Sequence, residues 1–494
     1  MTAGRIGLVA GALALAITTI VPAPAGLSQQ AFIVAGLVVL MAAWWMTEAI
    51  PLTATALMPF VVLPLAGVMG ADETASAYYA PILFLLLGGA FIALAIERTG
   101  LHRRLSLAIL KAIGTGGGQA RLLLAFMISA AVLSMLISNT STALIMMPMA
   151  LAVLAGGGVA INSEQGTPSS SEAVGPQRPP SSSEAVGQQE GLAGALPMGI
   201  AFAASIGGLG TIVGSPTNGI AVALIDDIIG VEISFARWMA FGLPVVLLGV
   251  PLAAAIISRV QKVAEHPFDV AQARAAIDDR RPWSPAEKRL VPLIALTFLA
   301  WMTQRWVAPF LPEDSWKDGT IAIIASLALF LLPDGTGRPL LRWKEADRAP
   351  WGVIMMFGGG LALAAGMQAS GLAAWLGEAL LFLEAVPVLV VALAIVAMVV
   401  LITEFASNVA TASAIIPIVA SLVVALGADP MLLAMPAALA ASWGFMLPAG
   451  TGPNAIAWST GNIRIGRMVR AGFVLDLCGI GVIVAVCFAV AGLA

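Results

Sequence analysis

The stretch Ser134-Met-Leu-Ile-Ser-Asn-Thr-Ser-Thr142 carries a polar tripeptide, Ser138-Asn139-Thr140, with apolar residues on both sides. The second half of the chain repeats it as Thr403-Glu-Phe-Ala-Ser-Asn-Val-Ala-Thr411, and each asparagine is followed nine residues later by a proline. A single polar tripeptide in an apolar helix more often serves helix–helix packing. A pair in register between two apolar halves indicates a binding site instead.

The composition sets the class of protein. Of the 494 residues, 60% are hydrophobic and 10% are charged, against roughly 25% charged in a soluble domain. Runs such as 6–21, 31–46 and 473–493 are long enough to cross about 30 Å of hydrocarbon as helices. The sequence therefore predicts an all-α polytopic membrane protein, in contact with lipid and not with nucleic acid.

Membrane spans are predicted at 6–22, 31–47, 52–68, 80–97, 235–258, 289–306, 319–332, 351–368 and 471–493. Two further apolar stretches, 121–155 and 387–426, contain the tripeptides. Two more spans, 192–229 and 431–461, are interrupted by glycine and proline near 214–218 and 450–454, where the helix should unwind. The N-terminal run also resembles a signal peptide, but it is long enough to remain as a first span.

The two halves repeat at a nearly constant offset, 269 residues for the asparagines (408 − 139). The first half has extra residues at 156–190 that the second half lacks. Within them, Pro168–Gly175 recurs as Pro180–Gly187. This low-complexity stretch predicts a disordered surface loop. The expected organisation is an N-terminal span (1–30), a first repeat (31–258), a cytoplasmic linker (259–288) and a second repeat (289–494).

The distribution of basic residues predicts orientation. Five Lys and Arg residues lie in 98–121, whereas the equivalent segment 369–386 has none, so the two segments face opposite sides of the membrane. That is typical of an inverted repeat. The basic segments 259–289, 338–348 and 464–470 are then also cytoplasmic. These assignments are consistent with one another if the chain has about eleven spans and two re-entrant hairpins, 121–155 and 387–426. The N-terminus is then inside the cell and the C-terminus outside.

Each tripeptide then lies at a hairpin tip, where a second helix presents its free amide groups and positive dipole end. Such an end suits an anion. Carbonyl groups freed at the two breaks suit a small hard cation such as Na⁺. No Lys, Arg or His lies beside either tip in the sequence, so the charge of the anion would have to be balanced by mobile cations.

The motifs resemble those of the divalent anion/sodium symporter family, the dicarboxylate, citrate and sulfate transporters that include the INDY proteins. The resemblance rests on Trp44-Trp45-Met-Thr-Glu48-Ala-Ile-Pro51, Ser138-Asn-Thr140, Gly214-Ser-Pro-Thr-Asn218, Thr403-Glu-Phe-Ala-Ser-Asn408 and Pro453-Asn-Ala455. It implies a homodimeric elevator-type transporter, in which a transport domain with both hairpins and both broken helices slides past a scaffold domain.

The resemblance also implies roles for individual residues. One sodium site would use Ser134, Ser138, Asn139 and Gly214, and the other Thr403, Ala406, Asn408 and Gly450. The anion would be bound by residues of the tips and breaks, namely Ser138, Asn139, Thr140, Ser215, Pro216, Thr217, Ser407, Asn408, Val409, Thr451, Gly452 and Pro453. Two positions depart from the family pattern: Val409 lacks the hydroxyl of Thr140, and Gly452 replaces a proline.

The expected function is Na⁺-coupled symport of a C4-dicarboxylate, with Na⁺ as the coupling ion and no other cofactor. Exchange of dicarboxylate, citrate or sulfate on the same fold is the alternative, and a passive channel is a third. An intramembrane enzyme is disfavoured because the predicted spans hold no histidine. The roles of two acids are left open. Glu48 either caps its helix or belongs to a proton or cation element, and Glu404 either supports its hairpin or binds a cation.

Overall fold

The computed structural model describes residues 3–114, 118–156, 190–266, 268–269 and 282–493. These residues form helices and contain no β-structure beyond one bridge between Pro333 and Pro339. The predicted loop 156–190 lies almost wholly outside the described residues, as does much of the linker 259–288, so both stay predictions.

The N-terminal part begins with an antiparallel pair, α1 (Ala3–Ile20) and α2 (Gln29–Thr47). Glu48 ends α2 in the left-handed conformation, with φ 48°, which supports the capping role. The segment predicted as one span at 52–68 forms two short helices, α3 (Leu52–Thr55) and α4 (Met58–Leu65), within one apolar stretch, and its crossing of the membrane stays a prediction. Pro59 explains the division, because it has no amide hydrogen to continue a helix from α3 but fits the first turn of α4.

The rest of the first half comprises α5 (Ala71–Ala77), α6 (Ile82–Thr99), α7 (Leu101–Gly114), the hairpin α8 (Gln119–Ser134) and α9 (Asn139–Gly156), α11 (Leu192–Gly208), η1 (Ile212–Gly214), α12 (Pro216–Ile229) and α13 (Phe235–Val260). The first break runs from Leu209 to Ser215, earlier than the predicted 214–218. Pro216 starts α12 instead of interrupting it, because its fixed φ suits the first helical position.

The second half comprises α15 (Pro285–Val307), η2 (Ala308–Phe310), α16 (Asp318–Leu331), α17 (Trp343–Ala346), α18 (Trp351–Ala369), α19 (Leu372–Ala379), η3 (Leu381–Ala385), the hairpin α20 (Val388–Phe405) and α21 (Asn408–Leu426), α22 (Pro430–Ala440), α23 (Gly452–Ser459) and α24 (Ile465–Ala491). The second break spans 441–451, longer than the predicted 450–454, and Pro453 again lies in the first turn of the following helix.

Ten helices of the described residues are long and apolar enough to cross a membrane, and several shorter apolar helices accompany them. Three of the ten are hairpin arms (α9, α20 and α21). The structure therefore agrees with a multi-pass membrane protein, whereas the predicted eleven crossings stay a prediction.

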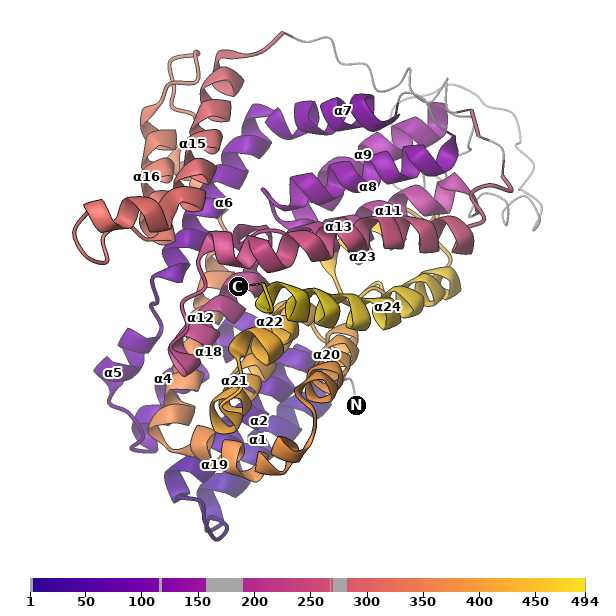
Figure 1. Cartoon of the computed structure of the whole chain (residues 1–494). Coiled ribbons are helices and arrows are strands. Elements are labelled where there is room, and N and C mark those ends of the chain that lie inside the picture. Colours follow the sequence, from indigo (N-terminus) through magenta and orange to yellow (C-terminus); the bar gives the residue numbers. More distant parts are fainter. Residues whose placement is uncertain (1–2, 115–117, 157–189, 267, 270–281, 494) are drawn as a thin grey trace.

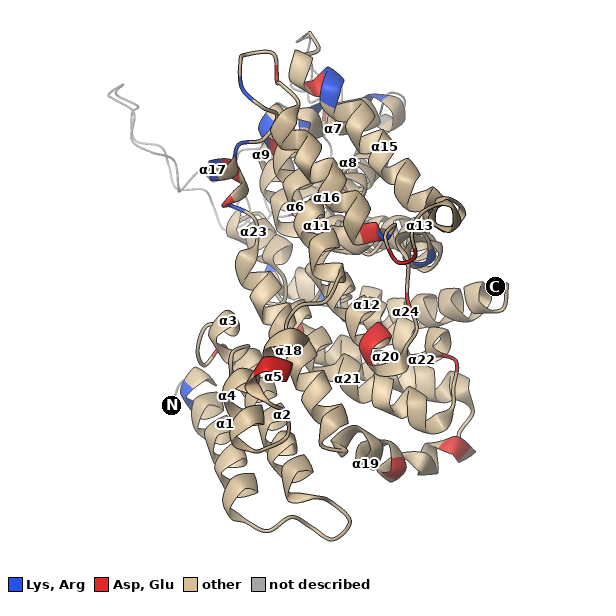
Figure 2. Cartoon of the chain, turned by 90° about the vertical axis from the view of Figure 1, so that its left-hand side faces the viewer, with Lys and Arg blue, Asp and Glu red and all other residues tan. Residues whose placement is uncertain are grey.

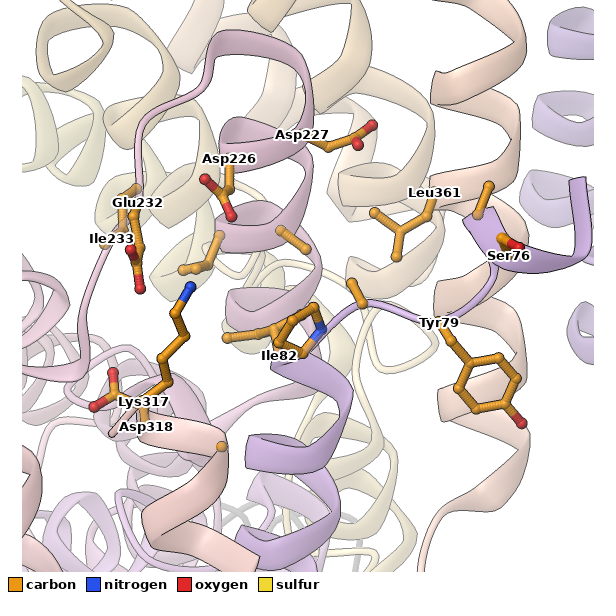
Figure 3. A pocket seen from close by; sticks show the side chains of 16 residues that line it. Ser76, Tyr79, Ile82, Asp226, Asp227, Glu232, Ile233, Lys317, Asp318 and Leu361 are labelled. Atoms are coloured by element: carbon orange, nitrogen blue, oxygen red, sulfur yellow. The ribbon is translucent and has the colours of Figure 1, made fainter. Parts of the chain in front are cut away.

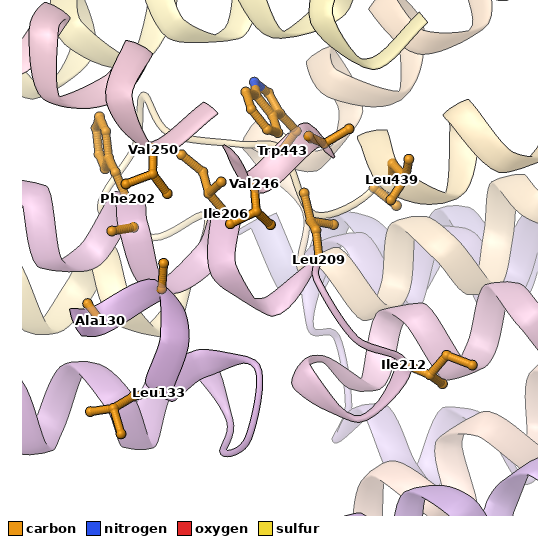
Figure 4. Packing of buried hydrophobic residues seen from close by; sticks show 14 of the residues in the cluster. Ala130, Leu133, Phe202, Ile206, Leu209, Ile212, Val246, Val250, Leu439 and Trp443 are labelled. Atoms are coloured by element: carbon orange, nitrogen blue, oxygen red, sulfur yellow. The ribbon is translucent and has the colours of Figure 1, made fainter. Parts of the chain in front are cut away.

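The broken helices join the two halves. The first part of each packs against the first arm of its own hairpin, α11 on α8 and α22 on α20. The second part of each packs against the other hairpin: α12 lies on α21 (Figure 1), and α23 lies on α9. Side chains of the second break complete this arrangement: Trp443 packs among residues of α11 and α13 (Figure 4), and Phe445 lies with its ring 4.9 Å from that of Phe202.

The helix that follows each broken helix, α13 in the first half and α24 in the second, has a glycine that allows close contact with the break. A Cβ at Gly472 on α24 would lie 2.5 Å from Met446 N and Phe445 C, both backbone atoms of the second break. The equivalent Gly242 on α13 meets the backbone of Leu209 in the first break. Glycine at these positions lets a helix lie directly on an unwound segment and hold its backbone in place.

We predict that Gly472→Ala destabilises the protein, because a methyl group there must displace backbone atoms, at a cost of about 1–3 kcal/mol. Gly466→Ala is the matched control, since Gly466 is an exposed glycine on the same helix with no atom near an added Cβ. Thermal unfolding in detergent should show a lower midpoint for Gly472→Ala alone. Equal midpoints for the two variants would contradict the close contact.

Candidate binding site at the hairpin tips

One cavity of about 440 Å³ is lined by both hairpin tips and by residues of both breaks, together with α6 and the start of α18. Its size lies within the range of about 300–1,000 Å³ that small-molecule sites occupy. The twelve residues predicted to bind the anion all line it: Ser138, Asn139, Thr140, Ser215, Pro216, Thr217, Ser407, Asn408, Val409, Thr451, Gly452 and Pro453. Segments up to 315 residues apart (453 − 138) thus meet at one place; the binding roles themselves remain predictions.

The tips are built by helix starts. Ser407 caps α21 by accepting a hydrogen bond from Ala410 N at 3.2 Å, and Ser138 accepts one from Ser141 N at the start of α9, also at 3.2 Å. Capping satisfies one free amide of each helix. The other amides of a first helical turn have no partner within the helix, which is the arrangement that favours an anion.

The first predicted sodium site is a cluster of oxygens behind the first tip. One terminal atom of the Asn139 side-chain amide lies 2.7 Å from Ser134 Oγ, 3.1 Å from Ala204 O and 3.2 Å from Gly214 O. This atom is the oxygen in one orientation of the amide and the nitrogen in the other. With nitrogen in that position, the amide can donate to these oxygens. With oxygen there, four oxygens converge, which is the kind of ligand set that holds Na⁺ at a helix break.

The second predicted sodium site has the same construction. Thr403 Oγ1 lies 2.9 Å from Asn408 Oδ1 and 2.8 Å from Ala441 O, but a hydroxyl has one proton and can donate to only one of them. Ala406 is buried, and Gly450 lies on the cavity wall. The donor set of neutral oxygens fits a hard monovalent cation here as well.

Two asparagines just after the breaks were not among the predicted site residues. Asn218 Nδ2 donates to Gly208 O at 2.7 Å and to Thr211 O at 2.8 Å, while Asn454 Nδ2 donates to Leu447 O at 3.2 Å. Both side chains are buried and both Oδ1 atoms lack a hydrogen-bond partner. Their matched positions in the two motifs were the signal that could have identified them as holding the breaks in shape.

Gly452, one of the two departures from the family pattern, lies beside the hydroxyl that Val409 lacks. Thr140, at the first tip, lies directly against Gly452, where an added Cβ would be 2.5 Å from Thr140 Oγ1. A proline at position 452 would therefore collide with the hydroxyl. The glycine makes room for Thr140, which helps to make the two sides of the cavity unequal.

Glu404 supports the second break. Its buried carboxylate accepts hydrogen bonds from Phe445 N, from Met446 N at 2.9 Å and from Leu447 N at 3.1 Å. Three amide donors that converge on a carboxylate stabilise an anion and repel a cation. Of the two roles left open for Glu404, the structure therefore favours support over cation binding.

We predict that Glu404→Gln lowers stability, because an amide has one acceptor oxygen and turns a donor toward the break. A buried amide left without a partner costs about 1–3 kcal/mol. Glu378→Gln, at an exposed position on α19, is the control for loss of a carboxylate. Thermal unfolding of the two variants in detergent should separate them, and an unchanged midpoint for Glu404→Gln would reject the supporting role.

The cavity wall also carries an ion pair that the sequence did not reveal. Arg348 Nη2 lies 2.8 Å from Glu97 Oε1, and both residues line the cavity, where they are the charged residues among those described. Although no basic residue lies beside either tip in the sequence, one therefore lines the cavity that the tips share. Arg348 is the last residue of the basic segment 338–348, just before α18. This position in the sequence was the feature that could have indicated a basic residue at the cavity.

A second cavity, of about 320 Å³, lies where α12 and the start of α16 meet α5 and α6 (Figure 3). Its charged lining residues are Asp226, Asp227, Glu232, Lys317 and Asp318. Four acids against one lysine make this wall repulsive to a dianion. None of the predicted site residues lines it, so the cavity at the tips is the better candidate for an anion.

Comparison with known proteins agrees with the motifs. The chain matches the family described as the sodium:sulfate symporter transmembrane region over residues 4–491. It is 38% identical to the sodium-dependent dicarboxylate transporter SdcS of Staphylococcus saprophyticus over 490 residues, which cover 98% of this chain and 90% of that protein. The SdcS protein of Staphylococcus aureus strain USA300 is 37% identical, with the same coverage.

A solved structure shows a similar fold at low sequence identity. The YdaH transporter of Alcanivorax borkumensis superposes with a TM-score of 0.53, at 15% identity, over 93% of this chain and 97% of that one. The family match and the full-length relatives carry the assignment. The protein is thus a membrane transporter and not an enzyme, and it belongs to the sodium:sulfate symporter family, the divalent anion/sodium symporters that its motifs resemble.

Proposed function

We propose that this protein couples the entry of Na⁺ to uptake of a C4-dicarboxylate such as succinate, malate or fumarate. The observation that carries the proposal is the cavity formed by both tips and both breaks, whose wall offers hydroxyl, amide and backbone groups and whose described charged residues are paired with each other. Such a wall gives a dianion no net positive partner, so bound cations must supply it. The names of the SdcS relatives support a dicarboxylate over sulfate.

Coupling would arise from the shared residues. Asn139 and Asn408 belong both to the oxygen clusters behind the tips and to the wall of the cavity. Na⁺ among those oxygens would fix the two amides and the helix starts that follow them. The dianion then binds well only after the cations, which is a positive coupling between the two sites.

We also infer an inverted repeat that works as an elevator within a homodimer. The mirrored packing of α12 on α21 and α23 on α9 supports the repeat. Basic residues gather near α7 and α17, whereas the far end, at α19, carries acids (Figure 2), which supports a cytoplasmic α7 and α17. Because Arg348 follows α17, the cavity would face the cytoplasm in this structure. The resemblance to the family supports the elevator and the dimer.

Uptake of radiolabelled succinate by proteoliposomes tests the proposed function. We expect uptake to require an inward Na⁺ gradient and to be inhibited by unlabelled malate and fumarate more strongly than by sulfate or citrate. Exchange is the second candidate, since Arg348 supplies a fixed charge at the cavity, although Glu97 neutralises it. Uptake that ignores Na⁺ and requires internal dicarboxylate would overturn symport in favour of exchange.

We predict that Asn139→Ala and Asn408→Ala each reduce Na⁺-dependent uptake by about 100-fold or more, since each removes hydrogen bonds to charged ligands worth about 1.5–3 kcal/mol apiece. Glu378→Gln, at an exposed position on α19, is the control and should transport normally. Membrane insertion of all three variants is checked by their yield in detergent extracts. Normal uptake by either asparagine variant would show that the hairpin tip carrying that asparagine is not part of the binding site.

A further inference from the structure

The ion pair between Glu97 and Arg348 stands at the edge of the cavity. Glu97 lies in the last turn of α6, and Arg348 lies in the connection between α17 and α18. The two side chains are 33% and 65% exposed, so both charges remain in contact with solvent. Both residues line the cavity together with the tips, which places a solvent-exposed guanidinium group in the same cavity as the predicted anion site.

The connection that carries Arg348 is anchored by other charges. Arg98, next to Glu97 on α6, pairs with Asp334 and also lies 3.4 Å from Glu345 Oε1. Arg338 Nη2 lies 2.6 Å from Glu345 Oε2. These pairs hold the segment 333–345 against the end of α6, so its backbone does not depend on Arg348. The contact with Glu97 can therefore open without loss of the local structure.

An exposed ion pair of this kind is weak, and its partners exchange readily. Its net contribution is about 0–1 kcal/mol, because water solvates both charges when they separate. A dianion carries twice the charge of the Glu97 side chain. Its carboxylates also match the planar guanidinium group, which can form two parallel hydrogen bonds to one carboxylate.

We propose that Arg348 recognises the dicarboxylate at the cytoplasmic mouth of the cavity, by exchanging the Glu97 carboxylate for a carboxylate of the substrate. Glu97 then competes with the substrate for Arg348. The Glu97 carboxylate pairs with the guanidinium group when no anion is bound, and it replaces the substrate carboxylate when the substrate is released. This inference rests on the proposed function, since it assigns a second anion contact on the path to the same site.

Half-saturation by succinate at the cytoplasmic face of proteoliposomes tests the exchange. For Arg348→Gln we expect the half-saturating concentration to rise roughly tenfold, as for one lost charge-assisted contact, with Na⁺ dependence retained. For Glu97→Gln we expect it to fall, because Arg348 no longer has a competing partner. The double variant should behave like Arg348→Gln. Raising ionic strength at fixed Na⁺ should shrink the difference between Arg348→Gln and the unmodified protein.

Lys344→Gln is the matched control, because Lys344 is an exposed base four residues away that does not line the cavity. A purely structural ion pair would make both single variants worse and the double variant no worse than either, which overturns the exchange. Equal half-saturation for Arg348→Gln and Lys344→Gln also overturns it and leaves the proposed function intact. Absence of Na⁺-dependent succinate uptake by the unmodified protein would overturn the proposed function and this inference with it.

Discussion

The packing of each broken helix against the hairpin of the other half is the contact on which the site depends. Inside a membrane, a helix end or an unwound segment is tolerated only where protein or a polar cavity meets its free backbone groups. Here α12 lies on α21 and α23 lies on α9, so each tip and each break faces its counterparts across one cavity. The polar residues of the motifs are the side chains that this arrangement brings together.

The two halves use different chemistry to hold equivalent backbone. In the second half a buried carboxylate, Glu404, accepts three amide hydrogens of the break. The equivalent position in the first half is Met135, whose backbone carbonyl accepts a hydrogen bond from Thr211 at 2.7 Å. The two sides of the cavity also differ. Thr140 lies against Gly452, and the position that corresponds to Thr140 in the second half is Val409. Selectivity between the two ends of a dianion is to be sought there.

The sequence was sufficient for the features that depend on local pattern. Hydrophobic length predicted the helices, and the repeated Ser-Asn pairs with their prolines predicted both hairpins, whose tips do meet. The positions of the breaks were wrong because proline was interpreted as an interruption, whereas Pro216 and Pro453 start helices. The pairing of Arg348 with Glu97 could not be predicted, since it depends on how residues 251 positions apart in the chain meet in space.

We propose that cations complete the anion site by fixing Asn139 and Asn408. Equilibrium binding of radiolabelled succinate to the purified protein, over a series of Na⁺ concentrations with choline as the replacement, tests it most directly. The dissociation constant for succinate should fall steeply as Na⁺ rises, and succinate should tighten Na⁺ binding by the same factor. An affinity for succinate that is the same in Na⁺ and in choline would contradict the account.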